Sequence, residues 1–181
     1  MLKDNLTKLK SEILSDDFEV GEAARKQLIK TDRKKALNFF ISLLRHQKQN
    51  IRDAAAISLR ELRDERATPH LMKAVIKNPA QAGTLVYALE KHDCALFFLK
   101  ILNIALYGNY EMQSHALIIL KEQKFKVTKK ELSKAQDMIR AYEGSKTKVK
   151  DYKVLLDEVS RYLKKIEKHI KFTVPRPKGT R

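Results

Sequence analysis

The stretch NIRDAAAISLRELRDERATPHLMKAVI, residues 50–76, decides the fold of this 181-residue chain. Its first half places apolar residues at helical spacing, the polar turn RDER interrupts that pattern, and a second amphipathic segment begins near Pro69. Proline is tolerated in the first turn of a helix, where its missing N–H would have no partner. Neither helix is long enough to bury its apolar face alone, so the pattern predicts a helix pair that packs on its neighbours.

The same helix pair recurs along the chain with a period of about thirty residues, which is the signature of a helical repeat array. In the first helix of each pair, one apolar column is Leu28, Leu59, Leu89 and Leu120. Four residues earlier stand Ala24, Ala55, Leu85 and Ala116. In the second helix the columns are Phe40, Leu71, Ile101 and Leu132, followed by Ile41, Met72, Leu102 and Ser133. We therefore expect four pairs that share one continuous core.

The segment IRDAAAISLRELRDERATPHLMKAVI resembles a HEAT-type repeat: a hydrophobic residue, Arg, small residues and Leu, then an acidic-basic turn with Ala and Pro. Residues 18–47 match in phase without the Pro, residues 80–109 keep the columns, and residues 110–141 match in the first helix. The resemblance implies antiparallel helix pairs in a right-handed superhelix, with the first helices convex and the second helices concave. We expect an all-α fold, a short α-solenoid of about four helix pairs with an N-terminal capping helix and a long C-terminal amphipathic helix.

The two ends of the array need polar outer faces. MLKDNLTKLKSEIL, with Leu2, Leu6, Leu9 and Ile13 on one stripe, suits an N-terminal cap, so we expect the repeat array and its cap over residues 1–143. A C-terminal amphipathic capping helix is expected over residues 144–170 and a basic flexible tail over residues 171–181. The C-terminal stripe also fits a coiled-coil or partner-docking helix, because its apolar positions recur every three or four residues. The oligomeric state stays open for the same reason.

Two helix starts carry capping signals. Asp93 precedes an apolar run and could cap it, and Thr128 is followed three residues later by Glu131, which is the spacing of a capping box.

The charge of the chain is strongly positive, +16 in total. Residues 111–181 carry nineteen Lys and Arg against nine Asp and Glu, so most of the excess lies there. Such a field attracts nucleic acid, an acidic protein face or anionic lipid. The chain has no Trp and no aromatic-basic interleaving of the kind that stacks bases, so a nucleic acid would be held by its phosphate backbone.

No catalytic or metal-binding pattern stands out. The five His residues lie in different repeats, the single cysteine, Cys94, is expected in the core, and no glycine-rich phosphate loop is present. We expect no enzyme activity, no cofactor and no metal. No signal peptide is evident and no apolar run is long enough to cross a bilayer, which predicts a cytoplasmic protein without a membrane span.

The resemblance implies a non-catalytic binding scaffold or adaptor that mediates protein–protein interaction through its concave second-helix face. Carried over by column, the exposed binding positions there are Ser42, Lys73, Asn103 and Lys134, flanked by Arg45, Lys77, Tyr107 and Lys130. The alternative is a nucleic-acid binding protein that uses this basic face and the C-terminal region. A mixed polar and apolar patch would favour a protein partner, acidic, extended or helical, and one stripe of lysines would favour nucleic acid.

Overall fold

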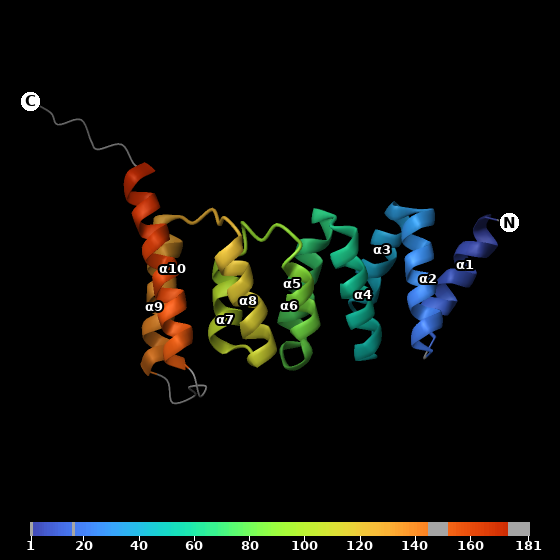
Figure 1. The fold of residues 1–181 in the computed structure, drawn as a ribbon, viewed down its shortest axis with the longest axis horizontal. Coiled ribbons are helices and arrows are strands. Elements are labelled where there is room, and N and C mark those ends of the chain that lie inside the picture. The colour runs from blue at the N-terminus through green and yellow to red at the C-terminus, as the bar shows by residue number, and fades with distance from the viewer. Residues whose placement is uncertain (1, 16, 145–151, 174–181) are drawn as a thin grey trace, which may run out of the picture. The chain divides into compact units, whose positions relative to one another are not determined.

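The structure is a computed structural model that describes residues 2–15, 17–144 and 152–173 (Figure 1). These residues form ten α-helices and no strand, so the predicted all-α fold is confirmed. The chain divides into an N-terminal unit, Met1–Asp93, and a C-terminal unit, Cys94–Arg181, which are described separately below.

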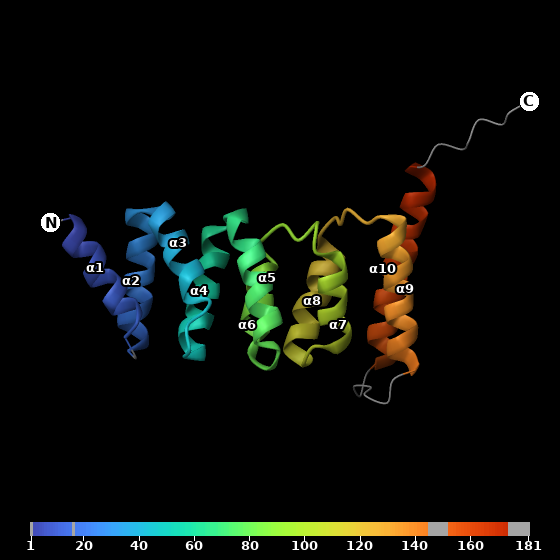
Figure 2. The same cartoon turned by 180° about the vertical axis from the view of Figure 1, so that it is seen from behind.

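The N-terminal unit holds a leading helix and then the helices of successive repeats. They are α1 (Leu2–Ile13), α2 (Phe18–Thr31), α3 (Arg33–Leu43), α4 (Gln49–Leu62), α5 (Thr68–Lys77) and α6 (Gly83–Leu89), with short 3-10 turns at Glu65–Ala67 and Pro79–Gln81. The first helices of the repeats, α2, α4 and α6, contact one another in sequence, with α4 in the middle (Figures 1 and 2). The second helices are α3 and α5.

The apolar columns read from the sequence form the core of this unit. Leu28, Leu59 and Leu89 are completely buried, and the small side chains of Ala24 and Ala55 four residues earlier are buried too. Small residues at these positions allow adjacent helices to approach closely. Leu9 and Ile13, from the apolar stripe of α1, are buried, as expected of a helix that covers the first repeat.

Acidic side chains fix the helix starts of the N-terminal unit. Asp17 accepts hydrogen bonds from the backbone N–H groups of Glu19 and Val20 at the start of α2. Asp32 accepts one from the N–H of Lys35 at the start of α3, at 2.9 Å. These contacts satisfy N–H groups that have no partner within the helix. Pro69 lies in the first turn of α5, as predicted.

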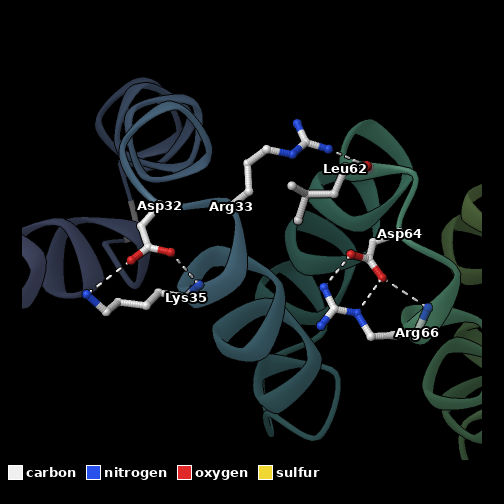
Figure 3. A network of polar contacts seen from close by, with 6 residues as sticks. All are labelled: Asp32, Arg33, Lys35, Leu62, Asp64 and Arg66. Atoms are coloured by element: carbon white, nitrogen blue, oxygen red, sulfur yellow. Dashed lines mark hydrogen bonds and ion pairs between the residues drawn. The ribbon is translucent and has the colours of Figure 1, made fainter.

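The RDER turn ends α4 and begins the next helix of the pair. Arg63 adopts a left-handed conformation with φ of 49°, which reverses the chain directly after α4. Asp64 then accepts hydrogen bonds from the backbone and the guanidinium of Arg66, and this contact lowers the pKa of Asp64 to about 2 (Figure 3). Arg33, at the start of α3, donates a 2.7 Å hydrogen bond to the carbonyl of Leu62 and so links consecutive repeats.

A second link joins α4 to α6. Arg60 donates a 2.6 Å hydrogen bond to the carbonyl of Tyr87, forms a 3.1 Å ion pair with Glu90, and places its guanidinium 3.7 Å from the centre of the Tyr87 ring. The buried imidazole of His92 lies 3.1 Å from the carbonyl of Leu59. Consecutive repeats are thus joined by polar contacts as well as by the apolar core.

The described residues of the C-terminal unit form four helices: α7 (Phe98–Tyr107), α8 (Tyr110–Glu122), α9 (Lys129–Gly144) and α10 (Tyr152–Thr173). Its core includes Ile101, Leu120 and Leu132 from the predicted columns, and Cys94 is fully buried as expected. In chain order the predicted third pair is α6 with α7 and the fourth is α8 with α9. The division between the two units therefore falls inside the third pair.

Two turns of the C-terminal unit depend on particular residues. Gly108 separates α7 from α8, and a Cβ there would lie 2.6 Å from the carbonyl oxygen of Ile104, so only glycine fits. Thr128 and Glu131 form the predicted capping box, with a 2.9 Å bond from the Thr128 N–H to the Glu131 carboxylate and a 3.2 Å bond in return. The predicted cap at Asp93 is wrong: α7 begins only at Phe98, after a turn, so the Asp93 side chain is too far back along the chain.

Helix α10 packs on α8 and α9 within this unit. Val159 and Leu163 of its apolar stripe are buried, and Glu158 forms a 2.8 Å ion pair with Lys121. The ring of Tyr162 is tilted against that of Phe98 and edge-on to that of Phe125. The helix continues to Thr173, so residues 171–173, which we assigned to the tail, are helical. Residues 174–181 lie outside the described part of the chain.

Candidate anion-binding site

All eight side chains predicted to bind a partner are exposed. Ser42, Arg45, Lys73 and Lys77 belong to the N-terminal unit, and Asn103, Tyr107, Lys130 and Lys134 belong to the C-terminal unit. In the N-terminal unit, Arg45, Lys73 and Lys77 line one pocket, whereas Ser42 lies outside it.

The pocket lies among the end of α3, the start of α4 and helix α5, and has a volume of about 260 Å³. Its apolar wall is formed by Ile41, Leu44 and Ala74. Its polar lining consists of Arg45, His46, Arg52, His70, Lys73, Lys77 and Asn78. No carboxylate is among these lining residues, so the pocket is positively charged.

The positions of the three exposed cations follow from the secondary structure around them. Lys73 and Lys77 are one turn apart on α5, so they lie on the same face of that helix. Arg45 lies two residues after the end of α3, in the turn that leads to α4. Within the ranges that the structure describes, none of the three forms an ion pair, so their charges remain available to a ligand.

Arg52 adds a buried cation to the pocket. Arg52 lies near the start of α4, and only 6% of its surface is exposed. One terminal nitrogen, Nη1, donates hydrogen bonds to the carbonyls of His46 and Gln47, at 2.9 and 2.7 Å, and Nη2 donates to the side-chain oxygen of Gln81 at 2.8 Å. All three acceptors are neutral.

The Nε–H of Arg52 is buried and has no hydrogen-bond partner among the described residues. No carboxylate of the described chain lies within ion-pairing distance of this guanidinium. A buried charge without a counter-ion is costly, by several kcal/mol per ion even after relaxation. An anion in the pocket would reduce that cost, so the arrangement favours anion binding.

Arg52, His46 and His70 also line the pocket, although they were not among the predicted binding residues. A signal for Arg52 was present, because it stands four residues before Ala56 and seven before Leu59, on the buried face of the helix. An arginine on a buried helical face needs acceptors or a counter-ion. The positions of the two His side chains depend on how the turn after α3 approaches α5, which no local pattern reports.

The four predicted residues of the C-terminal unit lie on helices α7 and α9, which contact each other. Asn103 and Tyr107 are one turn apart on α7, and Lys130 and Lys134 are one turn apart on α9. The ring of Tyr107 packs edge-on against that of Tyr142, with centroids 5.3 Å apart. The four positions carry amide, aromatic and cationic groups.

Comparison with known proteins agrees with the helix-pair architecture. Residues 6–90 match the family model described as HEAT repeats, which supports the predicted HEAT-like repeat architecture. The match covers nearly all of the N-terminal unit, including every residue that lines the pocket. No curated protein and no solved structure is significantly similar to the chain.

Two further properties bear on function. HEAT repeats commonly serve as protein-interaction scaffolds and are generally non-catalytic. None of the helices in the described ranges is long and apolar enough to span a membrane.

Proposed function

We propose that the N-terminal unit is a non-catalytic binding scaffold that docks an acidic segment of a protein partner on the surface formed by α3 and α5. The observation that carries the proposal is the pocket between these helices, with three exposed cations that form no ion pair in the described chain and no carboxylate in its lining.

The concentration of charge in the pocket supports this assignment. Residues 1–93 carry eighteen Lys and Arg against thirteen Asp and Glu, so the unit as a whole is only moderately basic. Four of these cations nevertheless line one pocket that contains no acid. A local cluster of one sign steers an oppositely charged partner and fixes its position.

The shape and lining of the pocket favour a polypeptide over a nucleic acid. An apolar wall of Ile41, Leu44 and Ala74 adjoins the cations, which suits a side chain flanked by apolar neighbours. No Phe, Tyr or Trp lines the pocket, so it offers no ring of these types on which a base could stack. A groove that follows a phosphate backbone needs a row of cations, whereas these converge on one compact space.

A direct test is fluorescence anisotropy with a fluorescein-labelled glutamate-rich peptide at low and physiological salt. We expect saturable binding that weakens with salt, since the exposed charges are screened within about 8–10 Å. The variant Lys73→Glu/Lys77→Glu should lose about tenfold or more in affinity, which corresponds to about 1.4 kcal/mol.

A matched control is Lys30→Glu/Lys91→Glu, which makes the same charge change at exposed positions of the same unit outside the pocket. This control should change affinity by less than about fivefold, because exposed surface charges contribute at most about 1 kcal/mol. Equal weakening in both variants would contradict the proposal. So would tighter binding of random duplex or single-stranded DNA or RNA that is abolished by the Lys73→Glu/Lys77→Glu change.

A further inference from the structure

We infer that the pocket receives a phosphoryl group of the docked segment, carried by a phosphorylated serine or threonine side chain. The inference rests on the proposed function and specifies the chemistry of the group that enters the pocket. It is carried by the three exposed cations that line the pocket, Arg45, Lys73 and Lys77, and by the buried guanidinium of Arg52.

The number of cations exceeds what one carboxylate can neutralise. Arg45, Lys73 and Lys77 are exposed without ion pairs in the described residues, and Arg52 is buried with only neutral acceptors. A carboxylate brings one negative charge, whereas a phosphate monoester carries about 1.5 to 2 at neutral pH and has three strong acceptor oxygens. The pocket therefore matches a phosphate better in both charge and hydrogen-bonding capacity.

The size of the pocket restricts what can enter. Its volume of about 260 Å³ lies below the range of roughly 300–1,000 Å³ that is usual for small-molecule sites. It accommodates a single side chain with its terminal group rather than a whole nucleotide cofactor. The adjoining apolar wall leaves room for the methylene or methyl part of the side chain that carries the phosphate.

Arg52 is held in place before any ligand binds. It donates hydrogen bonds to two backbone carbonyls of the turn between α3 and α4 and to the side-chain oxygen of Gln81, so the guanidinium is fixed at both terminal nitrogens. A preorganised cation loses little conformational entropy when the anion arrives. Lys73, Lys77 and Arg45 have flexible side chains and can adjust around the entering oxygens.

The test compares three fluorescein-labelled peptides of the same glutamate-rich sequence that differ at one central position: serine, glutamate or phosphoserine. We expect the phosphoserine peptide to bind at least about tenfold more tightly than the glutamate peptide, and the serine peptide to bind most weakly. The Arg45→Gln/Lys73→Gln variant, which changes only exposed side chains, should bring the phosphoserine and glutamate affinities to within about threefold of each other. Lys30→Gln/Lys91→Gln should preserve the preference.

A second measurement reports on Arg52 without mutating a buried residue. In ¹⁵N NMR spectra of the full chain, the Nε–H resonance of Arg52 should shift on addition of the phosphoserine peptide and stay in place with the serine peptide. Inorganic phosphate at millimolar concentration should displace the phosphoserine peptide by occupying the same pocket.

The outcomes separate this inference from the proposed function. Equal binding of the glutamate and phosphoserine peptides, with both lost in the Lys73→Glu/Lys77→Glu variant, overturns the phosphoryl inference and leaves acidic docking intact. No binding of any peptide overturns both. A phosphoserine preference that survives Arg45→Gln/Lys73→Gln places the phosphate elsewhere and also overturns the inference.

Discussion

Arg52 on α4 donates a 2.8 Å hydrogen bond to the side-chain oxygen of Gln81, twenty-nine residues along the chain and two residues before α6. This bond joins the second repeat to the beginning of the third, and it holds one wall of the basic pocket. The stability of the repeat stack and the geometry of the candidate site are therefore coupled at one side chain.

Gln81→Ala should lower the free energy of unfolding by about 1.5 kcal/mol, the lower end of the range for hydrogen bonds to charged groups, because Gln81 itself is exposed. Urea denaturation followed by circular dichroism measures the change. Gln47→Ala is the matched control, since Gln47 bonds Arg52 through its backbone carbonyl and keeps that bond when its side chain is shortened. A loss in the control as large as in Gln81→Ala would show that the side-chain bond is not the cause.

Leu59 occupies the completely buried first-helix column, and its truncation tests whether that column is the core. Leu59→Ala should cost about 2–5 kcal/mol, because the lost side chain leaves a cavity that its neighbours fill only in part. Ile57→Ala, two residues away on the same helix but 39% exposed, should cost clearly less. Denaturant midpoints of the two variants measure this difference, and similar midpoints would contradict the repeat core.

Gly108 tests the close approach between α7 and α8. Gly108→Ala should destabilise the chain by about 1–3 kcal/mol, because its Cβ would meet the Ile104 carbonyl oxygen at 2.6 Å and the Met112 Cβ at 2.8 Å. Gly144→Ala makes the same chemical change at the end of α9, where a Cβ meets nothing within 4 Å. That control should be neutral or mildly stabilising in thermal melts. A Gly108→Ala chain as stable as its parent would refute the tight turn.

The Asp64–Arg66 contact gives a pH-dependent signature. The pKa of Asp64 is lowered to about 2 in the folded chain, chiefly by the hydrogen bond from Arg66, against about 3.9 for an unfolded chain. A carboxylate with a lowered pKa adds stability above its unfolded pKa and loses it as pH falls through the folded value. Asp64→Asn retains a capping side chain without the charge, so its Tm should fall below the parent value at pH 7. The difference in Tm between Asp64→Asn and the parent should narrow below pH 4 and close near pH 2.

Periodicity predicted most of the fold because the apolar columns report burial directly. Leu28, Leu59 and Leu89 are buried as their spacing indicated, and the Thr128–Glu131 capping box forms because both partners lie within one helical turn. The prediction that Asp93 caps a helix was wrong because the chain makes a turn at Cys94–Phe97 before α7 begins. No local residue preference indicated this turn.

The candidate site was predicted less completely. Column positions identified Arg45, Lys73 and Lys77 as exposed, because exposure follows from helical phase. Their convergence on one pocket with Arg52 depends on the packing of α3, α4 and α5, which is a tertiary property. Arg52 itself stands on the buried face with neutral acceptors, and no sequence rule assigns such acceptors in advance.

The most direct measurement of the central claim is a map of backbone amide shifts in ¹⁵N-labelled full-length chain titrated with the glutamate-rich phosphoserine peptide. Acidic docking predicts that the largest shifts, saturating with one affinity, occur at Arg45, Lys73 and Lys77 and along the turn before Arg52. Shifts confined to the C-terminal unit, at Lys130 and Lys134, with none around the pocket would contradict it.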